Sequence, residues 1–127
     1  MSLNDLFIIE EWLPGDGFAT ARIRIHAAHR ILQGHFPGRP VVPGACLVQL
    51  VEELAALMAG APVRLVGAGP VKFIAMIEPG RDPVFLLTLR DAGRSGADWQ
   101  LAAEAVQAGA VCFKFRGTFR AGSGYAD

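Results

Sequence analysis

Residues 45–59 read Ala-Cys-Leu-Val-Gln-Leu-Val-Glu-Glu-Leu-Ala-Ala-Leu-Met-Ala, and this stretch decides the fold. It contains no proline, and its apolar side chains point in nearly every direction around a helical axis. A helix with this pattern is buried. Pro43 and Gly44 precede it, and Gly60 and Pro62 follow it, as is typical of helix boundaries. The sequence therefore predicts one buried helix over about residues 44–59, which a neighbouring layer must cover on more than one side.

Segments with strand patterns lie on both sides of this helix. Residues 20–26 alternate between apolar and polar side chains, which predicts a half-buried strand, and residues 6–12 form a weaker one. After the helix we expect four more strands, over about residues 71–77, 84–90, 99–106 and 111–120. A curved antiparallel sheet around one helix satisfies this order. We therefore predict a single α+β domain over residues 1–127, with a frayed tail at 121–127.

The last predicted strand has two different faces. Apolar side chains at positions 111, 113, 115 and 119 share one face, and Cys112 shares the other with three cations, Lys114, Arg116 and Arg120. We expect the cationic face to be exposed. Trp12, Trp99 and the phenylalanines are assigned to the core.

The composition excludes several classes of protein. Hydrophobic residues make up 52% and charged residues 19%, which argues against disorder, and the net charge of +0 argues against nucleic-acid binding. No apolar run is long enough to span a bilayer, and the first residues lack a secretion signal. Two cysteines do not make a disulfide framework. We expect a cytoplasmic protein with reduced thiols and no membrane partner.

Residues 33–44 read Gln-Gly-His-Phe-Pro-Gly-Arg-Pro-Val-Val-Pro-Gly and lead straight into the helix. Their prolines and glycines restrict the backbone path, and His35 lies among them. Residues 27–43 show no period, which predicts a long ordered loop, a frequent location of functional residues. The helix N-terminus that follows favours negative charge. A base beside such a terminus is suited to removing a proton alpha to a carbonyl group.

This segment resembles the signature of the FabA/FabZ-type beta-hydroxyacyl-ACP dehydratases, a GHFPG run followed by one variable residue and a Pro-apolar-apolar-Pro-Gly run. Val71-Lys72-Phe73 and the Pro79-Gly80 turn are similar to further family features, and the likeness covers about residues 20–119. The resemblance implies the hot-dog fold, an antiparallel sheet wrapped around one helix. It also implies a homodimer with active sites at the interface. A heterodimer with a related hot-dog subunit, or a higher oligomer, stays open.

The resemblance also assigns residues to the substrate site. His35 would remove the alpha proton of a 3-hydroxyacyl thioester, and Gly44 would donate its backbone N–H to the thioester carbonyl. Phe36 and Pro43 would line the same site. No cofactor and no metal is implied.

One position departs from the family pattern. Five residues after Gly44, where the family has an acid, this sequence has Gln49, and an amide is not a useful proton donor. Glu53 follows one turn later, about 5.4 Å along the helix, so it cannot replace the acid in the same pose. It would act through a water or on a differently placed substrate. Otherwise His35 would shuttle the proton alone.

Other polar residues carry weaker expectations. Arg39, Lys72 and Arg81 are candidate contacts for an acidic carrier protein or a phosphopantetheine phosphate, with ordinary solvation as the alternative. Glu52 is expected on a solvated helix face or in an interface ion pair. Cys46 is interpreted as a small core residue rather than a reactive thiol. The three histidines do not form a metal site, because no cysteine or acidic cluster completes one.

Three functions follow from these residues. The favoured one is a hydro-lyase that dehydrates (3R)-hydroxyacyl thioesters carried by ACP or CoA, in fatty acid, polyketide or aryl polyene synthesis. The second is a catalytically weak or inactive hot-dog subunit that binds acyl chains or pairs with an active partner, which Gln49 favours. The third is a hot-dog thioesterase in which Glu53 activates water, although thioesterase motifs do not normally contain the His-Phe-Pro-Gly run.

Overall fold

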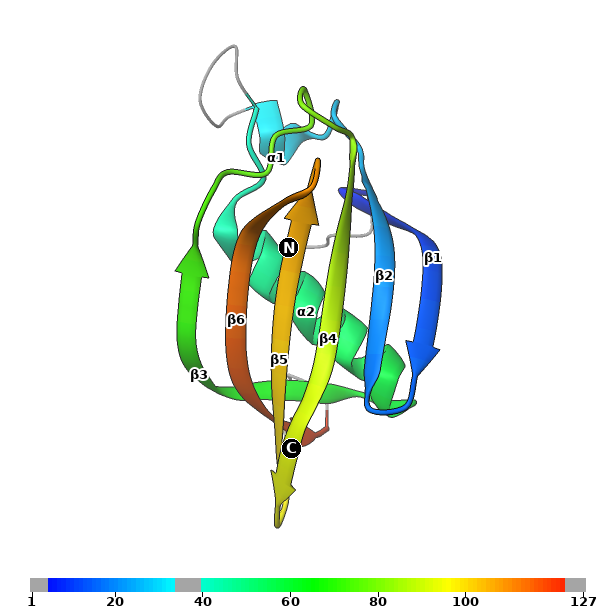
Figure 1. Ribbon diagram of the computed structural model, residues 1–127, viewed down its shortest axis with the longest axis vertical. Coiled ribbons are helices and arrows are strands. Elements are labelled where there is room, and N and C mark those ends of the chain that lie inside the picture. The colour runs from blue at the N-terminus through cyan, green and yellow to red at the C-terminus, as the bar shows by residue number, and fades with distance from the viewer. Residues whose placement is uncertain (1–4, 34–39, 123–127) are drawn as a thin grey trace.

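A computed structural model describes residues 5–33 and 40–122 of the chain. This part forms a six-stranded antiparallel sheet and a long helix that crosses one face of the sheet (Figure 1). The predicted α+β hot-dog architecture and the central helix at 44–59 are confirmed. The elements in chain order are β1 (Phe7–Gly15), β2 (Phe18–Ile25), α1 (Arg30–Gln33), α2 (Gly44–Ala59), β3 (Val63–Phe73), β4 (Val84–Ser95), β5 (Asp98–Gln107) and β6 (Ala110–Ala121).

The strands do not follow one another in chain order across the sheet. Their order is β1-β2-β4-β5-β6-β3, so β3 pairs with β6 at the far edge and β4 returns to pair with β2. The chain therefore passes from β2 through α2 to the opposite edge, and this crossing places α2 over the sheet (Figure 1). The edge strands of the sheet are β1 and β3.

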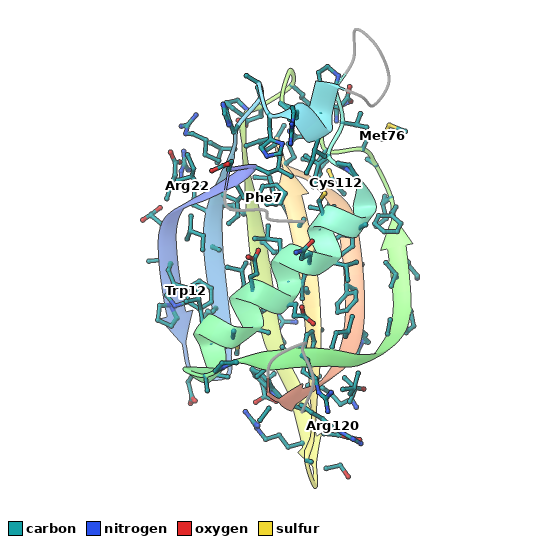
Figure 2. All side chains as sticks on the ribbon, turned by 180° about the vertical axis from the view of Figure 1, so that it is seen from behind. Phe7, Trp12, Arg22, Met76, Cys112 and Arg120 are labelled. Atoms are coloured by element: carbon teal, nitrogen blue, oxygen red, sulfur yellow. The ribbon has the colours of Figure 1, made fainter. Side chains whose placement is uncertain are left out.

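The core lies between α2 and the sheet face that it covers. Figure 2 shows α2 running diagonally across the sheet, with its N-terminal end near Met76 and Cys112 and its C-terminal end near Trp12. Large and small side chains alternate along the register: Leu89 lies opposite Ala103, which lies opposite Phe115. Such alternation lets the layers interdigitate. The buried residues of α2 are Cys46, Leu47, Leu50, Val51, Leu54 and Ala55.

The opposite side of α2 is not covered by the described chain. Glu53 and Leu57 are exposed there, and Leu57 keeps 50% of its surface accessible. We expected cover on more than one side, but the sheet of this chain supplies it on one side only. No helix in the described residues combines the length and the apolar character that crossing a membrane requires.

The strand β3 differs from its prediction at both ends. It begins at Val63 and ends at Phe73, whereas the pattern predicted residues 71–77. Gly67, Gly69 and Pro70 break the strand pattern in the sequence. The structure accommodates them with register shifts between Leu65 and Gly67 and between Ala68 and Val71. An edge strand tolerates proline and bulges, because its outer backbone groups need no partner strand.

Four other expectations are wrong. Cys112 is fully buried, because a register shift at Ala105 and Val106 moves it off the cationic face. Residues 30–33, expected in a loop, form the helical turn α1. The strand expected over residues 84–90 is longer, since β4 continues to Ser95. Phe18 and Phe73, expected in the core, are 45% and 58% exposed.

One buried polar side chain holds the turn that follows β3. Gln107 is fully buried, and its Oε1 accepts the N–H of Glu78 at 3.1 Å. Its Nε2 donates to the carbonyl oxygens of Glu78 and Asp82 at 2.7 and 2.8 Å. Next to this turn, the carbonyl of Ile77 accepts the N–H of Val42 at 2.9 Å. The turn in this way anchors the segment that leads into α2.

Replacing Gln107 by alanine is expected to lower the free energy of unfolding by about 1–3 kcal/mol. The N–H of Glu78 and the carbonyl of Asp82 lose the Gln107 side chain as a partner in a partly buried place, and the carbonyl of Glu78 loses one of its donors. Gln100→Ala is the matched control, since Gln100 is exposed and bonds only Thr118 at 2.8 Å. We expect it to change stability by less than about 0.5 kcal/mol. Urea denaturation measures both, and equal losses would contradict the role given to Gln107.

Candidate functional site

The N-terminus of α2 presents unpaired backbone donors. Pro43 precedes the helix in an extended conformation, with φ −62° and ψ 142°, and no side chain caps the helix. The carbonyl of Pro43 accepts the N–H groups of Cys46 at 3.0 Å and Leu47 at 3.4 Å. The N–H groups of Gly44 and Ala45 reach no acceptor among the described residues. Together with the helix dipole, these donors favour a partial negative charge at this point.

Gly44 lies directly against an aromatic ring. A Cβ atom at this position would approach Cε1 of Phe73 to 2.5 Å and Cζ to 2.6 Å. The absence of a side chain at Gly44 thus allows the Phe73 ring to lie over the start of α2. The ring packs beside Phe113 at a centroid distance of 5.5 Å. Ile74 and Met76, which follow it in the chain, are also about half exposed, so an apolar surface adjoins the free N–H groups.

The segment before the helix is fixed from both sides. Val41 and Val42 are buried, and the Val42 N–H donates to Ile77 as described above. This anchoring places Pro43 and Gly44 beside the strand end of β3. His35, Phe36 and Arg39 lie outside the described residues, so the roles that the resemblance gives them stay predictions.

The polar side chains of α2 differ in their surroundings. Gln49 and Glu52 are half-buried, and Glu53 is exposed. We expected Glu52 on a solvated helix face, but it is half-buried and its Oε2 accepts the backbone N–H of Leu65 at 2.7 Å. This bond ties α2 to β3 next to the first bulge of that strand. Glu52 is therefore a structural residue. An ion pair of Glu52 at a subunit interface stays a prediction.

Glu53 has a different electrostatic setting. Partial desolvation raises the pKa of its carboxyl group above the ordinary value of 4.5, and the negative charge of Glu52 raises the pKa further. A raised pKa means that a larger fraction of the group is protonated at a given pH than for an ordinary glutamate. That is the property required of a carboxylic acid that donates a proton.

The remaining candidate residues lie on separate elements. Lys72 is exposed on β3, and Arg81 lies in the following turn, where it pairs with Glu78 at 2.9 Å. Cys46 is buried, as expected, and burial raises the pKa of its thiol, which disfavours the reactive thiolate. Within residues 5–33 and 40–122, no group of three or more His, Cys, Asp or Glu side chains could hold a metal ion. The Nδ1 atom of His29 accepts the N–H of Ile31 instead.

Comparison with known proteins places this arrangement in a family. The family model described as "ApeI-like: ApeI dehydratase" matches residues 14–113. The chain belongs to the ApeI-like dehydratase family. A 3-hydroxyacyl-[acyl-carrier-protein] dehydratase FabZ from Syntrophobacter fumaroxidans is 30% identical over 81 residues, which cover 58% of this chain and 54% of that protein. The chain spans about half the length of the first curated relatives that it matches.

Solved structures share the fold of this ApeI-like chain. The dehydratase heterocomplex ApeI:P from Xenorhabdus doucetiae matches with a TM-score of 0.71 and 17% identity, over 90% of this chain and 97% of that one. A mutant hypothetical thioesterase from Streptococcus pneumoniae TIGR4 matches with a TM-score of 0.67 and 13% identity, over 92% and 91% of the two chains. At these identities the likeness concerns the fold alone.

Glu52→Ala is expected to lower the free energy of unfolding by about 1–3 kcal/mol, because the Leu65 N–H loses its charged acceptor in a half-buried place. Glu53→Ala on the same helix is the control, and we expect it to be neutral or slightly stabilising, since it removes repulsion between two carboxylates. Thermal and urea denaturation of both variants measure the difference. A loss of stability in Glu53→Ala but not in Glu52→Ala would reverse the assignment.

Proposed function

We propose that this chain dehydrates 3-hydroxyacyl thioesters whose carbonyl oxygen binds at the N-terminus of α2. The observation that carries the proposal is the N–H of Gly44 at the start of a buried helix, which reaches no acceptor within residues 5–33 and 40–122, in a chain of a dehydratase family. The apolar surface of Phe73, Ile74 and Met76 next to it suits an acyl chain. ACP or CoA would carry the substrate in a fatty acid, polyketide or aryl polyene pathway. The two free, buried cysteines agree with a cytoplasmic location.

The proposed reaction moves two protons. His35 takes the proton alpha to the thioester carbonyl, and the N–H of Gly44 stabilises the negative charge that develops on the carbonyl oxygen. The C–O bond to the 3-hydroxyl group then breaks as the double bond forms, and the hydroxyl leaves as water once it has gained a proton. Gln49 can hydrogen-bond this hydroxyl but cannot protonate it. Glu53, with its raised pKa, or protonated His35 supplies that proton.

A second candidate is a subunit that completes its site with another hot-dog chain. Two observations favour a partner, homodimeric or heterodimeric. The outward side of α2 is open at Leu57, and β3 is an edge strand with exposed Val66. An open edge strand beside exposed apolar side chains is suited to pairing with another chain. The name of the Xenorhabdus doucetiae neighbour describes a heterocomplex, which makes the heterodimer the alternative to test.

His35→Ala is expected to lower the turnover of a 3-hydroxyacyl thioester by about 10²- to 10⁴-fold, the usual contribution of a positioned base. Glu53→Gln should lower it less and should flatten the pH profile. Because the Glu53 pKa lies above 4.5, its protonated fraction falls as the pH rises through that pKa, and the rate that depends on it falls too. Gln49→Glu should raise the rate, since it restores an acid. Absorbance of the enoyl product measures each rate.

Two outcomes would contradict this assignment. Full activity of His35→Ala would place the base elsewhere. Release of free thiol at the same rate as consumption of the 3-hydroxyacyl thioester would indicate a thioesterase, because dehydration leaves the thioester intact. An inactive chain that gains turnover only when mixed with a related hot-dog subunit would favour the second candidate.

The assembly is tested by charge substitution on opposite edges. Ile74→Lys is expected to convert a dimer into a monomer in light scattering, because it introduces a charge beside β3. Leu13→Lys on β1 is the control, because Leu13 and Ile74 are equally exposed, at 54%. We expect the Leu13→Lys variant to remain a dimer. Dissociation by Leu13→Lys alone would move the interface to the other edge, and a monomeric wild-type chain would leave only the heteromeric arrangement.

A further inference from the structure

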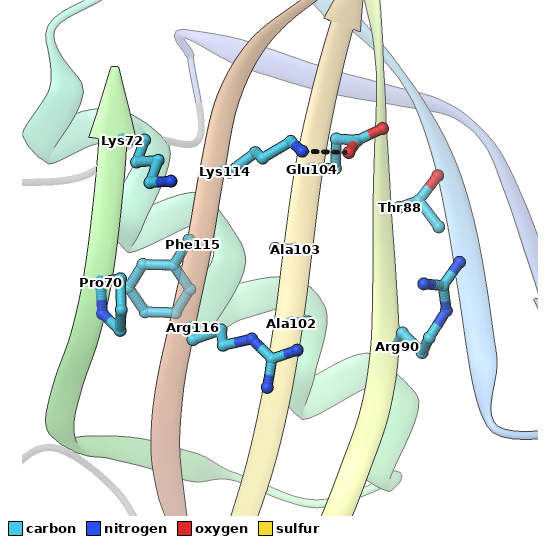
Figure 3. A pocket seen from close by; sticks show the side chains of 10 residues that line it. All are labelled: Pro70, Lys72, Thr88, Arg90, Ala102, Ala103, Glu104, Lys114, Phe115 and Arg116. Atoms are coloured by element: carbon cyan, nitrogen blue, oxygen red, sulfur yellow. Dashed lines mark ion pairs between the residues drawn. The ribbon is translucent and has the colours of Figure 1, made fainter. Parts of the chain in front are cut away.

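A groove of about 500 Å³ lies on the sheet face that turns away from α2. Figure 3 shows it with α2 behind the sheet and with the side chains of Lys114 and Arg116 extending from β6 over β5. Its wall includes four cations from three strands: Lys72, Arg90, Lys114 and Arg116. Its floor includes the small residue Ala102. The proposed acyl site uses none of these four cations.

The register of the strands produces the hollow. Ala102 pairs with Arg90 on β4 and with Arg116 on β6, so a methyl group lies between two long cationic side chains. Adjacent strands are about 4.8 Å apart, which places the two arginine backbones about 10 Å from each other. In the next row of side chains on this face, Lys114 of β6 pairs with Lys72 of β3. Two arginines and two lysines thus lie around the hollow, and the small side chain of Ala102 lies between the two arginines.

The charges of this groove are not balanced. Glu104 is the one carboxylate among the residues that line it, and it lies 3.9 Å from Lys114. Lys72, Arg90 and Arg116 form no ion pair among the described residues. Elsewhere on the same face the arginines are paired: Arg120 lies 2.6 Å from Asp98, and Arg24 lies 2.6 Å from Glu10. In a chain of net charge +0, three cations without an ion pair among the described residues therefore line one hollow.

We propose that this groove binds a phosphate-bearing small molecule of about nucleotide size, with a phosphate group held between Arg90 and Arg116 above Ala102. A guanidinium group presents two parallel N–H donors to one phosphate, and two such groups on either side of a gap suit a dianion. The two lysines contact a second anionic group of the same ligand. The volume lies within the range of ordinary small-molecule sites.

Two other occupants fit the groove less well. A second copy of this chain stacked face to face would set cations against cations, which is unfavourable for association. An acidic protein surface would match the charge, but it needs no hollow, since a flat cationic face would serve equally. The depression above Ala102 is the feature that points to a compact ligand.

The test is calorimetric titration of the full chain with inorganic pyrophosphate and with ADP at low ionic strength. We expect saturable binding with one site per chain, weakened by added salt because the contacts are exposed charge pairs. Arg116→Gln should weaken binding about tenfold, through the loss of a charge-assisted contact. Arg120→Gln is the matched control, because it removes an arginine from the same strand outside the groove and should leave the affinity unchanged.

Ala102→Leu separates a seated ligand from diffuse attraction, because it fills the floor and changes no charge. We expect it to abolish pyrophosphate and ADP binding while thermal stability is retained. Unchanged affinity in Ala102→Leu, or an equal loss in Arg120→Gln, would overturn the proposal. So would the absence of saturable binding of both probes. Binding of poly-glutamate alone would also overturn it and would assign the groove to an acidic protein.

Discussion

The burial of the apolar side of α2 against the sheet is the contact on which the other features of this chain depend. Leu47, Leu50, Val51 and Leu54 are almost inaccessible, and they meet phenylalanines and leucines from the central strands. This packing fixes the helix axis, and with it the direction of the N–H groups of Gly44 and Ala45 at the helix N-terminus. Each buried large apolar side chain contributes about 1.5–3 kcal/mol relative to its exposed state, so the position of the helix N-terminus is held by many contacts at once.

Three connections extend this rigidity from the core to the candidate site. The backbone hydrogen bond from Val42 to Ile77 holds the segment before α2 in place. Gln107 fixes the turn that begins next to Ile77 through its bond to the Glu78 carbonyl. The Glu52–Leu65 bond joins the middle of α2 to the edge strand β3. Because β3 ends at Phe73, whose ring lies over Gly44, the same strand is fixed at both ends relative to the helix. The proposed oxyanion position at Gly44 and the apolar surface beside it are thereby kept in one geometry.

Membership of the ApeI-like dehydratases gives this geometry a chemical context, and the helix shows where the chain departs from the family pattern. Gln49 stands at the acid position, and Glu53, one turn later, is exposed with a raised pKa. The neighbouring Glu52 accepts a backbone N–H, which leaves Glu53 as the carboxyl group of this helix to which the proposed proton transfer is assigned. The side of α2 that carries Glu53 is also the side that the sheet of this chain leaves uncovered. The proposed proton transfer and the proposed subunit pairing therefore involve the same surface of α2.

The sequence by itself determined the buried helix, the strand-rich order around it and the family, because these rest on local periodicity and on a contiguous motif. The helix at 44–59 and the exposed cations of β6 were predictable in this way. Features that depend on strand pairing were not. The burial of Cys112 and the length of β3 through Gly67 and Pro70 involve register shifts that the pattern of one strand does not contain. The role of Glu52 depends on a contact between α2 and β3. The hollow between Arg90 and Arg116 likewise required tertiary structure, since it arises from residues on three strands that are distant in the chain and become neighbours only when the backbone hydrogen bonds of the sheet form.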